Sequence, residues 1–170
     1  MQTDKKIIKY KDLSKIRKRA SSEGETIVFT SGCYDLLHLG HVMHFHYCKS
    51  KGDIFVVTIG NDKTIRELKG QGSPVHNEKF RARMIAAIEY VDHVVISEEF
   101  GKMDHNISMG LLKPDLFVLN ATDSAVAEKK KLVEEHGGKL VLCKRLPPGH
   151  KKGGVSTTQI KKKISRYGSK

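Results

Sequence analysis

The fold is decided by the stretch Thr26-Ile-Val-Phe-Thr-Ser-Gly-Cys-Tyr-Asp-Leu-Leu-His-Leu-Gly-His41. Its first five residues are β-branched or aromatic, which is typical of a buried strand, and Ser31-Gly32 marks the turn that ends this strand. A helix is predicted over about residues 41–51, so His38 and His41 lie at its start. Free backbone N–H groups at a helix start attract anions, and two imidazoles can donate further hydrogen bonds to the same anion. The stretch therefore predicts a phosphate site.

Further strand and helix patterns alternate along the rest of the chain. Apolar runs typical of buried strands occupy residues 53–60, 93–97, 116–120 and 139–143. Helical patterns occupy about residues 12–24, with Asp12 as the expected N-cap, and about residues 77–90, 104–112 and 125–136. Strands buried on both faces that alternate with helices indicate a covered parallel sheet. We therefore predict an α/β, Rossmann-like fold, in which a parallel five-stranded sheet carries helices on both faces.

Polar residues follow each of these strands at the point where it ends. They are Ser31 to Asp35, Asn61, Asp62, Ser97, Asn120 to Asp123 and Lys144. Ligands of open parallel sheets bind at the carboxyl ends of the strands, near the point where the strand order reverses. The long irregular segment 68–77 adds to this edge, because long loops there are usually functional. We expect the binding site at this edge.

The length of 170 residues favours a single domain that spans the whole chain, with flexible basic ends at residues 1–11 and 166–170. The formal net charge of +12 is confined to the two terminal regions, because residues 21–143 carry 14 basic against 17 acidic residues. Such ends leave a basic nucleic-acid-binding module as an alternative function. Solvated helix faces and a basic tail explain the charge more simply, so we expect no nucleic-acid partner.

Membrane and metal partners are not indicated. No stretch is apolar enough to span a bilayer, and the N-terminal residues lack the apolar core of a signal peptide, so we expect a cytoplasmic protein. The three cysteines are widely separated and form no Cys-x-x-Cys pair. A zinc site could combine His41 and His44 with His38 or His46, but no carboxylate or cysteine completes it at ligand spacing. We therefore predict no metal site built by the protein itself.

Two motifs far apart in the chain carry a family resemblance. Gly32-Cys-Tyr-Asp35 with His38-Leu-Gly-His41, and downstream Gly154-Val-Ser-Thr-Thr158, resemble the paired signatures of the small HxGH nucleotidyltransferases. This cytidylyltransferase-like family includes the enzymes that act on glycerol 3-phosphate, choline phosphate and ethanolamine phosphate. It also includes the adenylyltransferase domain that acts on glycero-manno-heptose 1-phosphate. Residues 69–75 and 86–92 look most like that heptose-phosphate branch, with the glycerol-3-phosphate cytidylyltransferases next.

The resemblance implies an enzyme that transfers an NMP group from an NTP to a phosphorylated acceptor and releases pyrophosphate. A heptose-1-phosphate-like sugar phosphate is the favoured acceptor, and a CTP-dependent enzyme acting on a polyol phosphate, an amino-alcohol phosphate or a phosphonate is the alternative. The nucleotide, ATP or CTP, would carry Mg²⁺, and related enzymes are commonly homodimers. The family's matching residues would make His38, His41 and Lys69 the catalytic groups.

The family pattern also assigns residues that bind the two substrates. The nucleotide-binding residues would be Ser31, Gly32, Cys33, Tyr34, Gly40, Asn120, Asp123, Lys151, Ser156, Thr157 and Thr158. Asp35 and Arg81 would bind the acceptor, although Arg81 could instead only brace the loop.

Two departures from the family pattern leave the base open. Residues 151–154 read Lys-Lys-Gly-Gly where cytidylyltransferases have Arg-Thr-x-Gly, and a lysine lacks the bidentate fork of an arginine. Residues 120–123 read Asn-Ala-Thr-Asp where the heptose-type enzymes have Lys-Gly-Gly-Asp. Asn120 and Asp123 could equally form a turn that caps the next helix, as Ser156 could be a plain N-cap.

Overall fold

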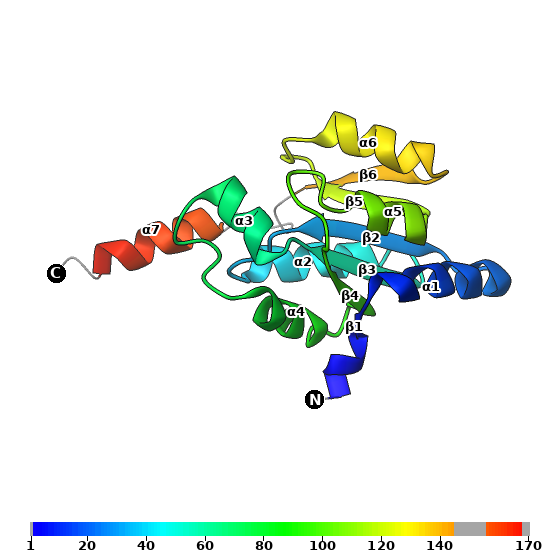
Figure 1. The fold of residues 1–170 in the computed structure, drawn as a ribbon, viewed down its shortest axis with the longest axis horizontal. Helices are drawn as coiled ribbons and strands as arrows, with labels where there is room; N and C mark the ends of the chain where they lie inside the picture. Colours follow the sequence, from blue (N-terminus) through cyan, green and yellow to red (C-terminus); the bar gives the residue numbers. More distant parts are fainter. Residues whose placement is uncertain (1, 145–155, 168–170) are drawn as a thin grey trace.

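A six-stranded parallel sheet with helices on both faces forms the centre of the computed structural model, which describes residues 2–144 and 156–167 (Figure 1). In chain order the elements are a 3₁₀ helix η1 (Gln2–Lys6), β1 (Ile7–Ile8), α1 (Tyr10–Glu23), β2 (Ile27–Gly32), α2 (Leu39–Lys49), β3 (Ile54–Ile59), α3 (Asp62–Lys69), α4 (Glu78–Ala86), β4 (His93–Ile96), α5 (Asn106–Leu112), β5 (Leu116–Asn120), α6 (Val126–Glu135), β6 (Lys139–Cys143) and α7 (Thr157–Tyr167). Within the described ranges, no helix is both long enough and apolar enough to cross a bilayer.

The strand order β1-β4-β3-β2-β5-β6 places a reversal between β2 and β5. From β2 the chain moves outward through β3 and β4 to one edge, and β5 and β6 then form the other edge. β2 pairs with β3 along its whole length, from Ile27 to Gly32, but with β5 only at Val28 and Phe29. The carboxyl half of β2 is therefore open toward β5, which is where such sheets bind ligands.

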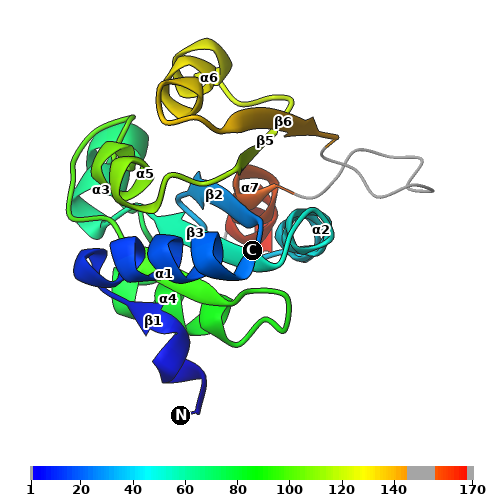
Figure 2. The same ribbon diagram turned by 90° about the vertical axis from the view of Figure 1, so that its right-hand side faces the viewer.

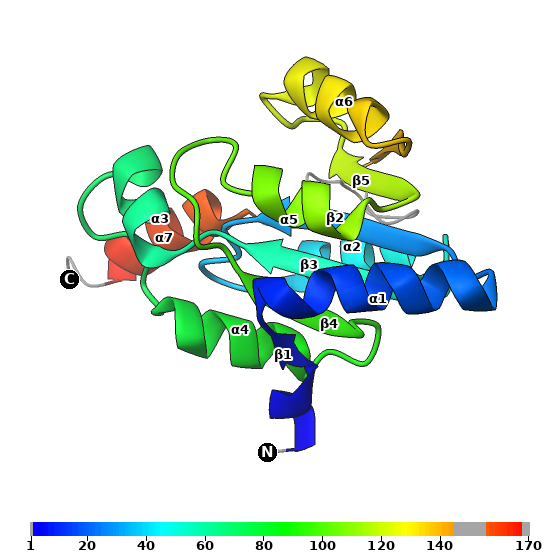
Figure 3. The same ribbon diagram turned by 45° about the vertical axis from the view of Figure 1, so that its right-hand side comes forward.

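Alternate residues of each strand face two separate hydrophobic layers. Phe29, Val56 and Phe117 pack under α1, α5 and α6, whereas Val28 and Val57 pack under α2 and α4. Figure 3 shows α1 and α5 in front of the sheet, and Figure 2 shows α6 and β6 at one edge, with α4 and β1 toward the other. Because both faces of the central strands are buried, these strands are near-continuous apolar runs, and the alternation of such runs with helical patterns is what predicted the α/β fold.

The predicted α/β fold is confirmed, but the sheet has six strands rather than five. The sixth is β1, in which Ile7 and Ile8 pair with Val94 and Val95 of β4. Residues 1–11 were expected to be a flexible end, yet Lys6 Nζ also donates to the Val91 carbonyl at 2.6 Å. Two apolar residues among lysines give too short a pattern to predict an edge strand.

The starts of two helices differ from the predicted positions, and one further helix was not predicted. α1 begins at Tyr10 rather than after Asp12, because Asp12 accepts a hydrogen bond from the Lys9 backbone N–H instead of acting as the N-cap. α2 begins at Leu39 rather than His41. α3 was not predicted at all: its N-cap, Asn61, accepts from Thr64 N at 2.9 Å, but its amphipathic pattern spans barely two turns.

Candidate active site

The carboxyl ends of β2, β3 and β5 open into a cavity of about 380 Å³. Its walls also include the start of α2 on one face of the sheet and the starts of α5 and α6 on the other. The cavity therefore crosses the carboxyl edge of the sheet at the predicted position. We call the part around Tyr34, His38 and His41 the α2 end. The part around Asp104, His105, Asn120, Asp123 and Lys129 is the α6 end.

Most of the predicted site residues lie in the wall of this one cavity. They are Ser31, Gly32, Cys33, Tyr34, Asp35, His38, His41, Lys69, Asn120, Asp123, Ser156, Thr157 and Thr158. Gly40 and Arg81 do not line it. Lys151 lies outside the described residues. The fold thus brings the two sequence motifs together across more than a hundred residues of chain.

The two histidines of the first motif form a stacked pair. His38 is the N-cap of α2, and its ring centroid lies 3.8 Å from that of His41, with 22° between the ring planes. The Tyr34 ring packs edge-on against His41 at 5.2 Å and against Phe45 at 5.1 Å. Gly32 permits this packing, because a Cβ there would lie 2.9 Å from the Tyr34 ring. The imidazoles are therefore held at the helix start by ring packing.

His44 lies one turn further along α2 and also lines the cavity. It was not among the predicted catalytic or binding residues. Its Nε2 lies 3.0 Å from Thr30 Oγ1, and its Nδ1 lies 3.0 Å from Cys143 Sγ. Because the Thr30 hydroxyl donates to the Val118 carbonyl at 2.8 Å, the network assigns the ring proton to Nε2 and leaves Nδ1 to accept from the thiol. Burial lowers the pKa of His44 to about 4, so the ring is neutral at pH 7.

Asp35 joins three segments at the α2 end. Its Oδ1 accepts from the Val75 backbone N–H at 2.6 Å, and its Oδ2 lies 2.9 Å from Lys161 Nζ of α7. Burial opposes ionisation of this carboxyl, but the hydrogen bonds from Lys161 and from the backbone outweigh it and hold its pKa below the usual value. Although Asp35 lines the cavity as predicted for an acceptor-binding residue, its oxygens are engaged in fixing the loop and the last helix.

The start of α7 is fixed to the same region by its hydroxyl residues. Ser156 and Gln159 exchange hydrogen bonds between side chain and backbone, as in a capping box. Thr157 Oγ1 donates to the Leu36 carbonyl at 3.3 Å. Ser156 is thus an N-cap, as the simpler alternative held, and all three hydroxyl residues also face the cavity.

Arg81 lies behind the cavity wall, not in it. Its side chain is fully buried, and its guanidinium donates to the Cys33 carbonyl at 2.6 Å, to the His76 carbonyl at 2.9 Å and to Asp62 Oδ1 at 2.7 Å. All these partners are loop or helix-start groups. The prediction that Arg81 binds the acceptor therefore does not fit its position, whereas the bracing alternative does.

Asp123 combines the two alternatives left open by the sequence. Its Oδ1 accepts from the Ala125 backbone N–H at 2.8 Å, which forms the turn into α6, and its Oδ2 lies 2.9 Å from Lys129 Nζ. Burial alone would raise the pKa of Asp123, but the hydrogen bonds from Lys129 and from the Ala125 N–H lower it. Asp123 is therefore an ionised wall residue held by its own helix.

Comparison with known proteins agrees with this geometry. A family model described as cytidylyltransferase-like matches residues 29–163. The chain belongs to this family. It is 34% identical over 170 residues to the bifunctional protein HldE of Syntrophotalea carbinolica, covering 98% of this chain and 33% of that protein. The HldE of Geobacter metallireducens is 37% identical over 169 residues, covering 98% of this chain and 32% of that protein. The chain thus spans about a third of the length of these curated relatives.

Solved structures show the same fold. The lipopolysaccharide core biosynthesis protein of Thermoplasma volcanium has a TM-score of 0.64 at 26% identity, and the match covers 73% of this chain and 100% of that one. Pantoate-beta-alanine ligase of Francisella tularensis has a TM-score of 0.63 at 17% identity over 95% of this chain and 77% of that one, and this shows the fold alone.

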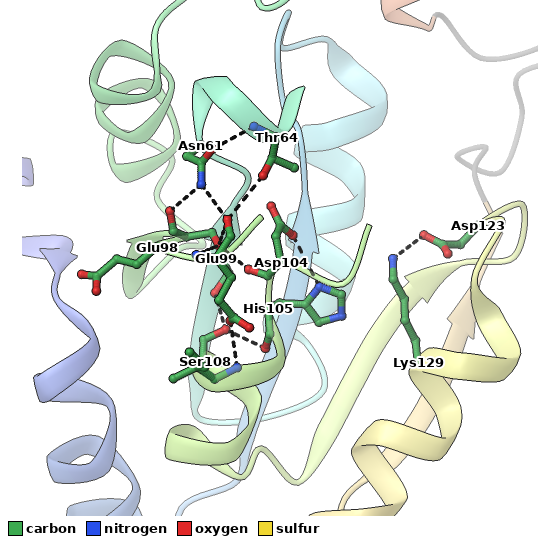
Figure 4. Close-up of polar contacts among 12 residues, drawn as sticks. Asn61, Thr64, Glu98, Glu99, Asp104, His105, Ser108, Asp123 and Lys129 are labelled. Carbon is green, nitrogen blue, oxygen red and sulfur yellow. Dashed lines mark hydrogen bonds and ion pairs between the residues drawn. The ribbon is translucent and has the colours of Figure 1, made fainter. Parts of the chain in front are cut away.

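The cavity of this cytidylyltransferase-like protein is also lined by polar residues that were not predicted from the sequence as site residues. Lys102, Asp104 and His105 follow β4, and Lys129 comes from α6. Figure 4 shows Asp104, His105 and Lys129. His105 is 1% exposed and Lys129 is 7% exposed. The rule that polar residues after a strand gather at the carboxyl edge would have found Asp104 and His105, had it been extended past Ser97. Lys129 gave no signal, because it lies among consecutive lysines of a helix.

Proposed function

We propose that this chain is a single nucleotidyltransferase domain that transfers an NMP group from an NTP to a sugar phosphate and releases pyrophosphate. The observation that carries the proposal is the convergence of His38, His41, Lys69 and the hydroxyls of Ser156, Thr157 and Thr158 on one cavity. The two histidines and the three hydroxyl residues come from opposite ends of the matched region, residues 29–163, and Lys69 lies between them in the sequence. They are the cationic and hydrogen-bonding groups that polyphosphates require.

The reaction needs two anions to be held together. A phosphate oxygen of the acceptor attacks the α-phosphorus of the NTP, a P–O bond forms, and the bond from the α-phosphorus to the bridging oxygen breaks. The electron pair leaves on pyrophosphate, and no covalent enzyme intermediate is required. Catalysis of this kind consists of positioning and of neutralising charge on the phosphate oxygens.

Each predicted catalytic residue has a role that fits its place. His38 and His41 stack at the start of α2, where their N–H groups and those of the helix would donate to the transferred phosphate. Lys69, the last residue of α3, would pair with the triphosphate and the acceptor phosphate. Ser156, Thr157 and Thr158 at the start of α7 would contact the departing phosphates.

Magnesium would enter as the counter-ion of the nucleotide. Among residues 2–144 and 156–167 no three His, Cys, Asp or Glu side chains are grouped so as to hold a metal ion. The cavity carboxylates already face groups of this chain, with Asp35 on Lys161, Asp123 on Lys129 and Asp104 on His105. The chemistry that Mg²⁺ would supply when bound is charge neutralisation on the phosphates.

The acceptor we favour is a heptose-1-phosphate-like sugar phosphate. Support comes from the HldE relatives, which match nearly the whole chain, and from the similar Thermoplasma structure, which is a lipopolysaccharide core biosynthesis protein. A CTP-dependent reaction on a polyol phosphate, an amino-alcohol phosphate or a phosphonate is the second candidate. The description of the matching family as cytidylyltransferase-like favours it. We also propose a homodimer, which light scattering on the purified protein would test.

Pyrophosphate release tests the proposal directly. Purified protein with Mg²⁺ is given ATP or CTP and one acceptor at a time, from a panel of sugar, polyol and amino-alcohol phosphates. We expect release that requires one nucleotide and one acceptor. Binding of neither nucleotide in calorimetry would overturn the proposal.

A further inference from the structure

His105 at the α6 end is a buried side chain with one polar atom left for a ligand. Its ring packs between Phe29 of β2, at 6.3 Å between centroids, and Phe117 of β5, at 5.5 Å. Nδ1 lies 3.6 Å from Asp104 Oδ1. Nε2 is buried and has no hydrogen-bond partner among the described residues, although the ring lines the cavity. Buried polar atoms without partners are rare in native proteins, and each needs an explanation.

The segment that carries His105 is held rigidly. The Asn61 amide donates to the Glu99 carbonyl at 2.7 Å (Figure 4) and to the Ser97 carbonyl at 3.1 Å. The Ser97 hydroxyl donates to the Asp104 carbonyl. The Asp104 carboxylate also lies against Gly60 at the end of β3, where a Cβ would come within 2.9 Å of Oδ2. The orientation of the ring is therefore fixed before any ligand binds, as a specific binding site requires.

The carboxylate beside Nδ1 determines what Nε2 can do. In the neutral ring the proton belongs on Nδ1, where it faces Asp104, so Nε2 carries the lone pair. This tautomer is assigned from the contacts. Nε2 is thus prepared to accept a hydrogen bond from an O–H or N–H group of a bound molecule.

The groups around His105 fit a neutral polyol better than a phosphate. Lys129 and Asp123 lie across the cavity from it as an ion pair at 2.9 Å (Figure 4). Asn120 Oδ1 is a further buried acceptor with no partner in the described part of the chain. With Lys102, which also lines the cavity, the two carboxylates are balanced by two ammonium groups, so no excess positive charge at the α6 end favours a phosphate. Adjacent hydroxyls, which both donate and accept, match such a mixture.

We propose that the α6 end is a subsite for the hydroxyl groups of a sugar ring, and that His105 Nε2 accepts a hydrogen bond from one of them. The inference rests on the proposed function, because both substrates of that reaction contain a sugar. The ring is either the ribose of the nucleotide or the sugar of the acceptor. His105 would then determine specificity for a hydroxylated substrate.

Deoxy analogues and a matched pair of variants test the subsite. Calorimetry without acceptor gives the dissociation constants of ATP and CTP and of their 2′-deoxy and 3′-deoxy forms. A second titration uses glycero-manno-heptose 1-phosphate. The variants are H105F, which keeps an aromatic ring but removes Nε2, and H136F, a control at the C-cap of α6, whose ring lies near Gly110 of α5 and does not line the cavity. H105Q is the rescue variant, because its amide reaches the position of Nε2, and it also serves if H105F does not fold.

Ribose as the source predicts that one deoxy form binds wild type about tenfold more weakly, the usual effect of leaving a buried acceptor unpaired. This ratio should fall toward one in H105F and persist in H136F and H105Q. The acceptor sugar as the source predicts equal binding of all nucleotide forms by wild type, with about tenfold weaker heptose 1-phosphate binding in H105F alone. The subsite would be overturned if wild type, H105F, H136F and H105Q all had the same ratio of deoxynucleotide to nucleotide dissociation constants and the same affinity for heptose 1-phosphate. Failure of wild type to bind any nucleotide would instead overturn the proposed function.

Discussion

The Lys161 ammonium lies 2.9 Å from Oδ2 of the fully buried Asp35 and so ties the last helix to the loop after β2. In the described part of the chain, this pair and the hydrogen bond from the Thr157 hydroxyl to the Leu36 carbonyl are the main polar links between α7 and the α2 end. No residue of α7 is buried among those the structure describes. The position of Ser156, Thr157 and Thr158 in the cavity therefore depends on polar contacts more than on core packing.

D35N should loosen α7 and destabilise the fold. We expect a loss of about 1–3 kcal/mol in the free energy of unfolding at pH 7, because Lys161 and the loop lose a charged partner. Since the folded state lowers the pKa of Asp35, its contribution is present above the unfolded value near 3.8 and is lost as the pH falls below it. Urea unfolding of wild type and D35N should thus converge on acidification. A difference that grows toward low pH would contradict this account.

R81A should act on stability, since Arg81 is a brace. Its guanidinium is fully buried and satisfies Cys33, His76 and Asp62, so its removal should cost about 3–5 kcal/mol. R83A is the matched control, because that side chain is 58% exposed and its ion pair with Asp4, at 3.5 Å, lies near solvent. Its removal should change the free energy of unfolding by less than about 0.5 kcal/mol. An R81A protein with normal stability and a raised KM for the acceptor would restore the acceptor-binding role.

The residues His38 and Arg81 illustrate which features of the fold and site could be predicted from the sequence and which could not. Strands β2 to β6 were predictable because each is an apolar run whose alternate residues enter two cores. The two motifs could be placed together because both adjoin the carboxyl edge. The sequence left Arg81 between acceptor binding and bracing, because the pattern of an arginine before an apolar helix is the same whether the side chain faces a ligand or three carbonyl and carboxylate oxygens. His105 was missed because the polar residues after β4 were followed only as far as Ser97, and the absence of a partner for its Nε2 is a property of packing that no local pattern records.

H41A should lower turnover by about a hundred- to a thousandfold with little change in stability. The His41 ring stacks on His38 at 3.8 Å at the helix start, and the loss of one donor to a developing phosphate charge usually has this effect. H46A is the control on the same helix, since the exposed His46 ring packs against Tyr90 away from the cavity. Pyrophosphate release under saturating substrates measures both. An H41A enzyme within a factor of three of wild type would remove His41 from the mechanism.

His44 should make the fold less stable between pH 6.5 and pH 4. Burial lowers the pKa of His44 from 6.5 to about 4, so the unfolded state binds its proton first as the pH falls. Stability is then complete above pH 6.5 and decreases toward pH 4, by about 3 kcal/mol for a shift of this size. H44Q keeps a hydrogen-bonding side chain but cannot titrate, so its urea midpoint should fall less than that of wild type over this interval. Equal slopes for the two proteins would mean that His44 is protonated in the folded state, and the assignment of Nδ1 as the acceptor for Cys143 would then be wrong.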